Sequence, residues 1–254
     1  MSREVARPVC LITGGARRIG AAFARRLAPA FDLALHYNSS RDEAEAVAIE
    51  LRQHGGRVEL FPAEFSEPEK AAELVRSVSA TFGPLDLVIN SASAFDYDDA
   101  ADFTAATMQR LLAVNVVAPL VIAREFARYG SPRALLVNML DNKVMAPNPD
   151  YFSYSVGKFA LKAAADMLAM RFAGNMRVNS IAPGNTLVSG AQSPENFEHS
   201  WRRTLTGSGP TLDDLASTVE FLWNTPSING ETIVVDGGQR LMGLTRDVAF
   251  IDDR

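Results

Sequence analysis

The sequence predicts an α/β fold in which a doubly wound parallel sheet of about seven strands carries helices on both faces. Short, continuously apolar runs alternate along the chain with longer segments whose apolar residues recur at helical spacing. Apolar strands that are separated by crossover helices are typical of a parallel sheet buried on both faces. The 254 residues, with 47% hydrophobic and 22% charged, have the size and composition of a soluble globular protein. One domain over residues 1–254 accommodates all of these segments.

The predicted elements follow one another as strand and helix. Seven apolar runs are predicted strands: Val9–Thr13, Leu33–His36, Val58–Phe61, Leu85–Asn90, Ala134–Asn138, Val178–Ile181 and Thr232–Val235. The segments with helical spacing are Ile19–Leu27, Asp42–Leu51, Pro68–Phe82, Thr104–Tyr129 and Tyr154 to about Phe172. Residues 184–209 lack clear periodicity and follow the sixth strand, which predicts a lid or substrate-binding loop. The tail 240–254 is more apolar than a free tail needs, and we expect it to dock on a neighbouring subunit.

Charge and composition exclude several classes of function. A net charge of −5 and an isoelectric point near 5.3 argue against a nucleic-acid partner. The lone Cys10 lies in an apolar run and has no second cysteine, so we expect a buried thiol and a reducing compartment. The N-terminus carries charges in place of a signal peptide's apolar core, and no apolar run approaches the roughly 18 residues of a membrane helix. We expect a cytoplasmic protein with a small-molecule substrate, and neither a membrane partner nor a metal site.

A glycine-rich turn follows the first predicted strand. Residues 13–20 read Thr-Gly-Gly-Ala-Arg-Arg-Ile-Gly and lead directly into a predicted helix. The backbone N–H groups of such a turn and the N-terminus of the helix together bind a pyrophosphate. The position of the turn between a strand and a helix favours a Rossmann-type dinucleotide site over a purely structural turn.

The end of the second predicted strand indicates which dinucleotide binds. A site for NAD would place a carboxylate there for the ribose 2′-hydroxyl, and the chain has none at this position. Asn38, Ser39 and Ser40, with Arg17 or Arg41 in reach, instead suit a 2′-phosphate through charge-assisted hydrogen bonds. The sequence therefore predicts NADPH. His36 is either a ligand near this phosphate or a packed ring at the end of the strand.

Tyr154 and Lys158 form a Tyr-x-x-x-Lys pair at the start of a long predicted helix. Residues four apart lie on one face of a helix, so the ammonium group sits beside the phenol. We expect the cation to lower the pKa of the phenol from about 10 toward working pH, which suits a general acid. Asp141 stands thirteen residues before Tyr154. Burial would raise the pKa of Asp141 and Lys158 would lower it, so the sequence leaves its protonation state open.

These motifs together resemble the short-chain dehydrogenase/reductase superfamily over almost the whole chain. The matching segments are the Thr-Gly turn, Asn90–Ser93, Asn115, Tyr154 with Lys158, Pro183–Gly184 and Asp236–Gly238. The resemblance implies that Tyr154 protonates the substrate, that Lys158 holds the nicotinamide ribose and that Asn115 holds a water chain to Lys158. With Asp141 they form the predicted catalytic set. The predicted cofactor contacts are Gly14, Arg17, Arg18, Ile19, His36, Tyr37, Asn38, Ser39, Ser40, Glu64, Phe65, Asn90, Ala92, Tyr154, Lys158, Pro183, Gly184, Asn185 and Thr186.

Two departures from the superfamily pattern point to a substrate class. Arg18 replaces the middle glycine of the turn, and Asp141 replaces the usual catalytic serine. Both changes resemble the pteridine reductases, including the bacterial dihydromonapterin reductase type. In those enzymes an aromatic residue at the position of Phe95 stacks on the pterin. The predicted substrate contacts are Arg18, Ser93, Phe95, Asp141 and Tyr154, with Met139, Leu187 and Val188 as further walls. The resemblance also implies a homotetramer.

Three hypotheses about function remain open at this stage. The first is an NADPH-dependent reductase of dihydropterins, with dihydrofolate as a further candidate substrate, because a carboxyl group can supply or relay the proton that a ring nitrogen needs. The second is an NADPH-dependent carbonyl reductase of 3-oxoacyl or sugar substrates. Turnover of ketones, together with no turnover of pterins, would favour this hypothesis. The third is a non-enzymatic NADPH-binding module. The retained Tyr154, Lys158 and Asn115 argue against the third hypothesis.

Overall fold

The computed structural model describes residues 7–188 and 192–251, which are organised around one seven-stranded parallel sheet. The strands are β1 (Val9–Thr13), β2 (Asp32–Tyr37), β3 (Val58–Pro62), β4 (Leu85–Asn90), β5 (Gly130–Met139), β6 (Arg177–Pro183) and β7 (Thr232–Val235). Their order is β3-β2-β1-β4-β5-β6-β7, and every neighbouring pair is parallel. The seven predicted strands are confirmed. The largest difference is at β5, which begins at Gly130 and not at Ala134.

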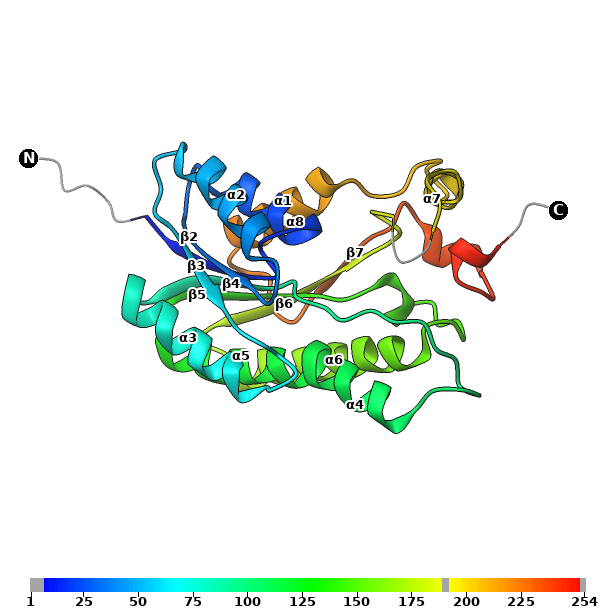
Figure 1. Ribbon diagram of the computed structural model, residues 1–254, viewed down its shortest axis with the longest axis horizontal. Helices are drawn as coiled ribbons and strands as arrows, with labels where there is room; N and C mark the ends of the chain where they lie inside the picture. The colour runs from blue at the N-terminus through cyan, green and yellow to red at the C-terminus, as the bar shows by residue number, and fades with distance from the viewer. Residues whose placement is uncertain (1–6, 189–191, 252–254) are drawn as a thin grey trace, which may run out of the picture.

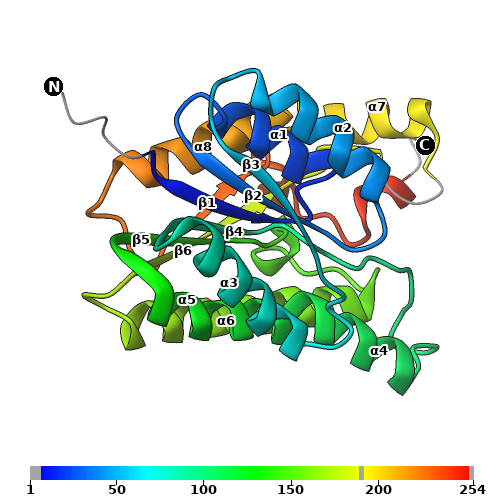
Figure 2. The same ribbon diagram turned by 60° about the vertical axis from the view of Figure 1, so that its left-hand side comes forward.

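Helices cover both faces of this sheet (Figures 1 and 2). One face carries α1 (Arg18–Leu27), α2 (Arg41–Arg52) and α8 (Leu212–Asn224), and the other carries α3 (Glu69–Phe82), α5 (Ala118–Tyr129) and α6 (Phe152–Arg171). Side chains of a strand alternate between the two layers. In β1, Cys10 and Ile12 pack into the first layer, whereas Val9 and Leu11 pack into the second. The predicted doubly wound α/β class is confirmed.

The buried cysteine was also predicted correctly. Cys10 is fully buried in β1, and burial raises the pKa of its thiol well above the ordinary value. A buried thiol with a raised pKa is a poor nucleophile. Cys10 is therefore a small apolar residue of the core.

The predicted helix Thr104–Tyr129 is a helical run in three parts: α4 (Ala105–Leu112), a π-helical turn (Ala113–Val117) and α5. Within residues 7–188 and 192–251, this is the one helix long and apolar enough to cross a membrane by length and composition, with a mean hydropathy of 1.6. Its residues Ile122 and Phe126 are fully buried against the sheet. The hydropathy of the run therefore fits a helix of the core.

Segment 184–209 was expected to be irregular, and this expectation was wrong in its middle. The structure has α7 there, from Pro194 to Arg202, while residues 189–191 lie outside the described part of the chain. The Ser193 hydroxyl caps the helix by accepting the N–H of Asn196 at 3.2 Å, and Pro194 occupies the first turn. These capping residues are visible in the sequence. The helix buries little of its surface, so its apolar periodicity is weak.

The described part of the tail packs on its own chain. After β7, two short 3₁₀ turns form at Gln239–Met242 and Val248–Phe250, and Val248 is buried. Backbone carbonyls of Val248 and Ala249 accept hydrogen bonds from α7. Docking of the tail on a neighbouring subunit stays a prediction, because Leu241 and Phe250 remain exposed.

Candidate active site

The order of the strands places a cleft at one edge of the sheet. Chain connections run in opposite directions from β1 and β4, and ligands bind beyond the carboxyl ends of strands at such a point. A cleft of about 880 Å³ lies there. Most of the predicted site residues line it: Gly14, Arg17, Arg18, Ile19, His36, Tyr37, Asn38, Ser39, Ser40, Glu64, Phe65, Ala92, Ser93, Phe95, Asp141, Tyr154, Lys158, Pro183, Gly184, Asn185 and Thr186.

Two of the predicted residues lie behind the wall of the cleft. Asn90 is buried, and its amide donates to the Oδ1 of Asn138 on the neighbouring strand at 2.9 Å. Asn115 is also buried, and its Nδ2 donates to the carbonyl of Ala94 at 2.8 Å. Its Oδ1 accepts the Ser93 hydroxyl and the Ala94 N–H. Asn115 therefore holds the segment that carries Phe95, while its contact with a water chain stays a prediction.

The turn after β1 has the geometry of a phosphate cradle. Gly14 has a φ of +65°, and a Cβ added at Gly20 would lie 2.2 Å from the Gly14 carbonyl oxygen. Only glycine permits so close an approach between the turn and the helix. The first turn of α1 has no side-chain cap and no acidic residue. Its backbone N–H groups are thus available to an anion, as a dinucleotide requires.

His36 is hydrogen-bonded to this turn. The backbone N–H of Gly14 donates to its Nδ1 at 3.1 Å, so the proton of the neutral ring is on Nε2, which lies 3.0 Å from the Ala63 carbonyl. The ring also stacks on Phe65 at 4.2 Å. Burial lowers the pKa of His36 to about 4, which keeps the ring neutral. Both nitrogens are engaged, so His36 is the packed ring of the two alternatives and supports the phosphate turn indirectly.

The end of β2 presents amides and hydroxyls to the cleft. Asn38 donates to the Glu64 carboxylate at 2.6 Å, and Ser39 and Ser40 line the same wall. Arg17 lines the cleft and pairs with Glu43 at 3.4 Å, whereas Arg41 does not line it. Arg17 is therefore the better placed of the two arginines for a 2′-phosphate.

Arg18 occupies a strained backbone position at the start of α1. Its φ of 53° lies in the left-handed region, where a side chain costs about 1–2 kcal/mol relative to glycine. Its guanidinium donates to the carbonyl of Val188 at 2.9 Å, across the cleft toward the segment that leads to α7. Strain at a ligand site indicates that the side chain has a role. Of the predicted walls, Met139 and Leu187 line the cleft, and Val188 contributes this carbonyl.

Three ionisable groups meet at the end of β5. The Tyr154 hydroxyl donates to the Oδ2 of Asp141 at 3.1 Å, and the backbone N–H of Lys143 donates to its Oδ1 at 2.9 Å. Lys158 donates to the carbonyl of Met139 at 2.7 Å. All three side chains are held by elements of the core, since Asp141 follows β5 and Tyr154 and Lys158 belong to α6.

The expected lowering of the Tyr154 pKa was wrong. Burial, followed by the charge of Asp141 and the hydrogen bond to it, raises the pKa of Tyr154 well above 10. The neighbour that the phenol contacts is a carboxylate, and the ammonium of Lys158 lies 5.4 Å from the ring centroid. Burial also raises the pKa of Asp141 and lowers that of Lys158 to about 8. Tyr154 thus keeps its proton, and Asp141 holds one more readily than an exposed carboxyl group.

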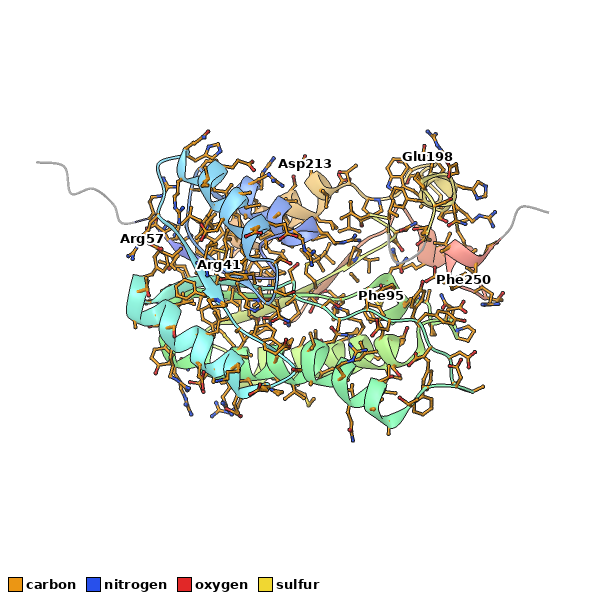
Figure 3. The ribbon with its side chains drawn as sticks, in the orientation of Figure 1. Arg41, Arg57, Phe95, Glu198, Asp213 and Phe250 are labelled. Atoms are coloured by element: carbon orange, nitrogen blue, oxygen red, sulfur yellow. The ribbon has the colours of Figure 1, made fainter. Side chains whose placement is uncertain are left out.

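Aromatic rings form one wall beside this corner. The rings of Tyr154 and Phe95 are nearly perpendicular, with a centroid distance of 4.7 Å and an interplanar angle of 87°. Phe95 stacks on Tyr151 at 4.4 Å, yet 37% of its surface stays exposed. Figure 3 shows Phe95 near the end of the molecule that carries Phe250. Phe95 therefore presents an apolar surface beside Tyr154.

Sequence reasoning missed three residues of this end: Lys143, Tyr151 and Asp247. Tyr151 has a φ of 55°, a second strained position at the cleft. Asp247 arrives from the tail and pairs with Lys143 at 2.7 Å. Tyr151 was signalled by its place three residues before Tyr154, whereas no local pattern predicts the long-range pair of Lys143 and Asp247.

Comparisons with known proteins agree with this geometry. Residues 8–198 match the model of the family described as short chain dehydrogenase. The crystal structure of FolM alternative dihydrofolate reductase 1 from Brucella canis, complexed with NADP, has a TM-score of 0.87 and 37% identity, covering 94% of this chain and 96% of that one. The Brucella suis protein in complex with NADP has a TM-score of 0.88 and 38% identity, with coverage of 92% and 95%. NADPH-dependent aldehyde reductase 2, chloroplastic, from Arabidopsis thaliana is 30% identical, with coverage of 91% and 93%.

Proposed function

The chain belongs to the short-chain dehydrogenase family and is an oxidoreductase, and from this premise we propose that it is an NADPH-dependent reductase of dihydropterins. Its phosphate turn and the amides and hydroxyls after β2 suit NADPH, and both Brucella relatives were crystallised with NADP. The observation that carries the substrate class is the contact between Asp141 and Tyr154. A carboxyl group stands where a carbonyl reductase of this family has a hydroxyl, and it shares a hydrogen bond with the proton donor.

The reaction has a simple balance. When bound, NADPH would supply a hydride to the carbon of a ring C=N bond. The neighbouring nitrogen would take up one proton, so that the double bond becomes C–H and N–H. Tyr154 and Asp141 are joined by a hydrogen bond and form the site from which that proton is delivered. Lys158 is buried in the same site, and its positive charge stabilises the anion that remains when the pair gives up a proton. The products are the tetrahydropterin and NADP⁺.

The walls of the cleft suit a flat heteroaromatic ring. The exposed part of Phe95 would contact this ring, and stacking is worth roughly 1–3 kcal/mol for bases on aromatic side chains. Arg18 and Ser93 line the same cleft, where the Arg18 guanidinium supplies donors to ring oxygen and nitrogen atoms. The Ser93 hydroxyl donates its proton to Asn115, so it offers the ring an acceptor. Asn115 positions Phe95 through Ala94.

A panel of substrates tests the proposal. Purified protein should oxidise NADPH in the presence of dihydrobiopterin, dihydromonapterin or dihydrofolate, and should prefer NADPH to NADH. Absence of NADPH oxidation with all three pterin substrates would overturn it. The same panel should contain ketones and aldehydes, because the resemblance to an aldehyde reductase supports a second candidate, an NADPH-dependent carbonyl reductase. Turnover of carbonyl compounds with inert pterins would establish that alternative.

Replacement of Arg18 by glycine separates stability from activity. Glycine adopts the φ of 53° without strain, so Arg18→Gly should raise the free energy of unfolding by about 1 kcal/mol. Loss of the guanidinium should lower kcat/KM for dihydropterin about 10- to 100-fold, as expected for one charged hydrogen bond. Thermal unfolding and NADPH oxidation measure the two effects. Arg17→Gly, at an extended φ of −147°, is the matched control and should gain no stability. A destabilised Arg18→Gly variant with full activity would contradict this role.

The pH dependence of the rate should reflect Lys158. Burial lowers the pKa of Lys158 to about 8, so the protonated form that assists proton delivery is lost as the pH rises through that value. We expect kcat/KM to fall on the alkaline side with an apparent pKa near 8. In Lys158→Arg the guanidinium stays charged, and the alkaline decline should disappear. An identical alkaline limb in the two proteins would exclude Lys158 as its cause.

Assembly and location complete the proposal. We infer a cytoplasmic homotetramer, and the exposed apolar side chains of Met167 and Met170 on α6, at 59% and 71% exposure, support an interface there. Light scattering of the purified chain would test the assembly. A monomer at micromolar concentration would contradict it.

A further inference from the structure

The segment Arg246–Phe250, here called the tail segment, is anchored beside the proton-donating corner. The Arg246 guanidinium forms a forked pair with the carboxylate of Asp150, with N–O distances of 2.6 to 3.0 Å. The backbone N–H of Asp247 donates to the same carboxylate at 2.7 Å. Asp150 is 2% exposed and lies just before α6. The tail segment is therefore fixed to the loop that leads into the catalytic helix.

The tail segment also joins this loop to α7. The carbonyl of Ala249 accepts the Asn196 amide at 3.1 Å, and the carbonyl of Val248 accepts the Ser200 hydroxyl at 3.4 Å. On the other side, the ring of Phe250 stacks on Tyr151 at 5.9 Å. Figure 3 shows Phe250 and Glu198 of α7 at the same end of the molecule. The tail segment thus forms one wall of the cleft at its substrate end, and Asp247, Val248 and Ala249 line it.

The charges of this wall are almost fully paired. The buried ammonium of Lys143 contacts the Asp247 carboxylate at 2.7 Å and donates to the Asp150 carbonyl at 3.1 Å. Arg246 is paired with Asp150, and Arg110 on α4 is paired with Asp96. In the described part of the chain, Lys143 and Arg246 beside the tail segment are therefore each paired with a carboxylate. Arg18, at the phosphate turn, donates to the backbone carbonyl of Val188.

We propose that Asp247 is a specificity-determining residue whose carboxylate disfavours substrates with an anionic substituent on the ring and favours short, uncharged polar substituents. The inference rests on the proposed function, because it requires the substrate ring to bind against Phe95. The Asp247 carboxylate neutralises the Lys143 ammonium, so the wall offers an anionic substituent no unpaired positive charge to offset the loss of its hydration. Dihydrobiopterin, which carries a short diol, and dihydrofolate, which carries a glutamate, differ in this property.

The substitution Asp247→Asn tests the role of this charge. Asparagine keeps the size of the side chain and an oxygen for the N–H of Ala249, which Asp247 accepts at 3.0 Å. It leaves the Lys143 ammonium without its counter-charge and open to an anionic substituent. The ratio of kcat/KM for dihydrofolate to that for dihydrobiopterin should rise by about tenfold or more, mainly through KM for dihydrofolate. The matched control is Asp213→Asn on α8, a surface carboxylate paired with Arg26 at 3.1 Å, which should keep the wild-type ratio.

A second measurement needs no variant. In the diamide of dihydrofolate both glutamate carboxylates are neutral at nearly the same size, so the wild-type protein should reduce it with a kcat/KM about tenfold higher than that for dihydrofolate. Equal values for dihydrofolate and its diamide, or an unchanged ratio in Asp247→Asn, would overturn the role of Asp247 while leaving the proposed function intact. Failure of the wild-type protein to reduce any of these three compounds or dihydromonapterin would instead refute the proposed function, and this inference with it.

Discussion

Replacement of Asp141 by serine should lower kcat/KM for dihydropterin reduction about 10²- to 10³-fold. Asp141 accepts the Tyr154 hydroxyl and the Lys143 N–H with its two oxygens, and burial raises the pKa of its carboxyl group. Serine has one oxygen and a shorter side chain, so it loses one of these contacts and the acidic proton. Steady-state NADPH oxidation with dihydrobiopterin measures the effect.

Asp141→Asn serves as the matched control for this variant. Asparagine keeps the shape and can accept the Lys143 N–H, but it has no proton to deliver, so it should be impaired as severely as serine if proton delivery is the role of Asp141. Full activity in the asparagine variant would assign Asp141 to ring anchoring alone. If pterins were inert and Asp141→Ser kept or raised the turnover of ketones, the carbonyl-reductase alternative would be favoured.

Replacement of Tyr154 by phenylalanine should lower kcat about 10²- to 10⁴-fold. The variant removes one hydroxyl group and keeps the ring, whose centroid lies 4.7 Å from that of Phe95. Burial and the carboxylate of Asp141 raise the pKa of Tyr154, so the native phenol carries its proton at neutral pH and can donate it. Single-turnover NADPH oxidation at saturating dihydropterin measures the chemical step.

The control for this variant is Tyr129→Phe at the end of α5, which removes a hydroxyl group that does not line the cleft. It should retain the wild-type rate. A Tyr154→Phe variant that loses less than about tenfold in the chemical step would show that the proton comes from another group, since general acid catalysis contributes far more than this. Asp141 would then be the direct donor.

Local patterns in the sequence predicted the fold and the centre of the site. The apolar run Val9–Thr13, the glycine turn and the four-residue spacing of Tyr154 and Lys158 are each fixed by short-range backbone geometry. Because parallel strands end at one edge of the sheet, residues that follow different strands meet there. Asp141 and Phe95, which follow β5 and β4, are therefore brought to the same cleft as Tyr154.

Properties that depend on three-dimensional distances were not predictable in this way. The spacing of Tyr154 and Lys158 suggested a lowered phenol pKa, but the closer partner of the phenol is the carboxylate of Asp141. The pair of Lys143 and Asp247 joins residues about a hundred positions apart, and no periodicity marks it. Helix α7 was missed because it buries little apolar surface.

Under the proposed function, the cleft reduces a ring C=N bond and not a carbonyl group. This is tested most directly by incubating the purified protein with dihydrobiopterin and NADPH that carries deuterium at the transferable position of the nicotinamide, and by determining the mass of the product. The expected product is tetrahydrobiopterin that has gained a single deuterium on a ring carbon. The same reaction should be strongly slowed in the Asp141→Ser variant. Unlabelled dihydrobiopterin at the end of the reaction, under conditions in which a ketone is reduced and labelled, would contradict the proposed function.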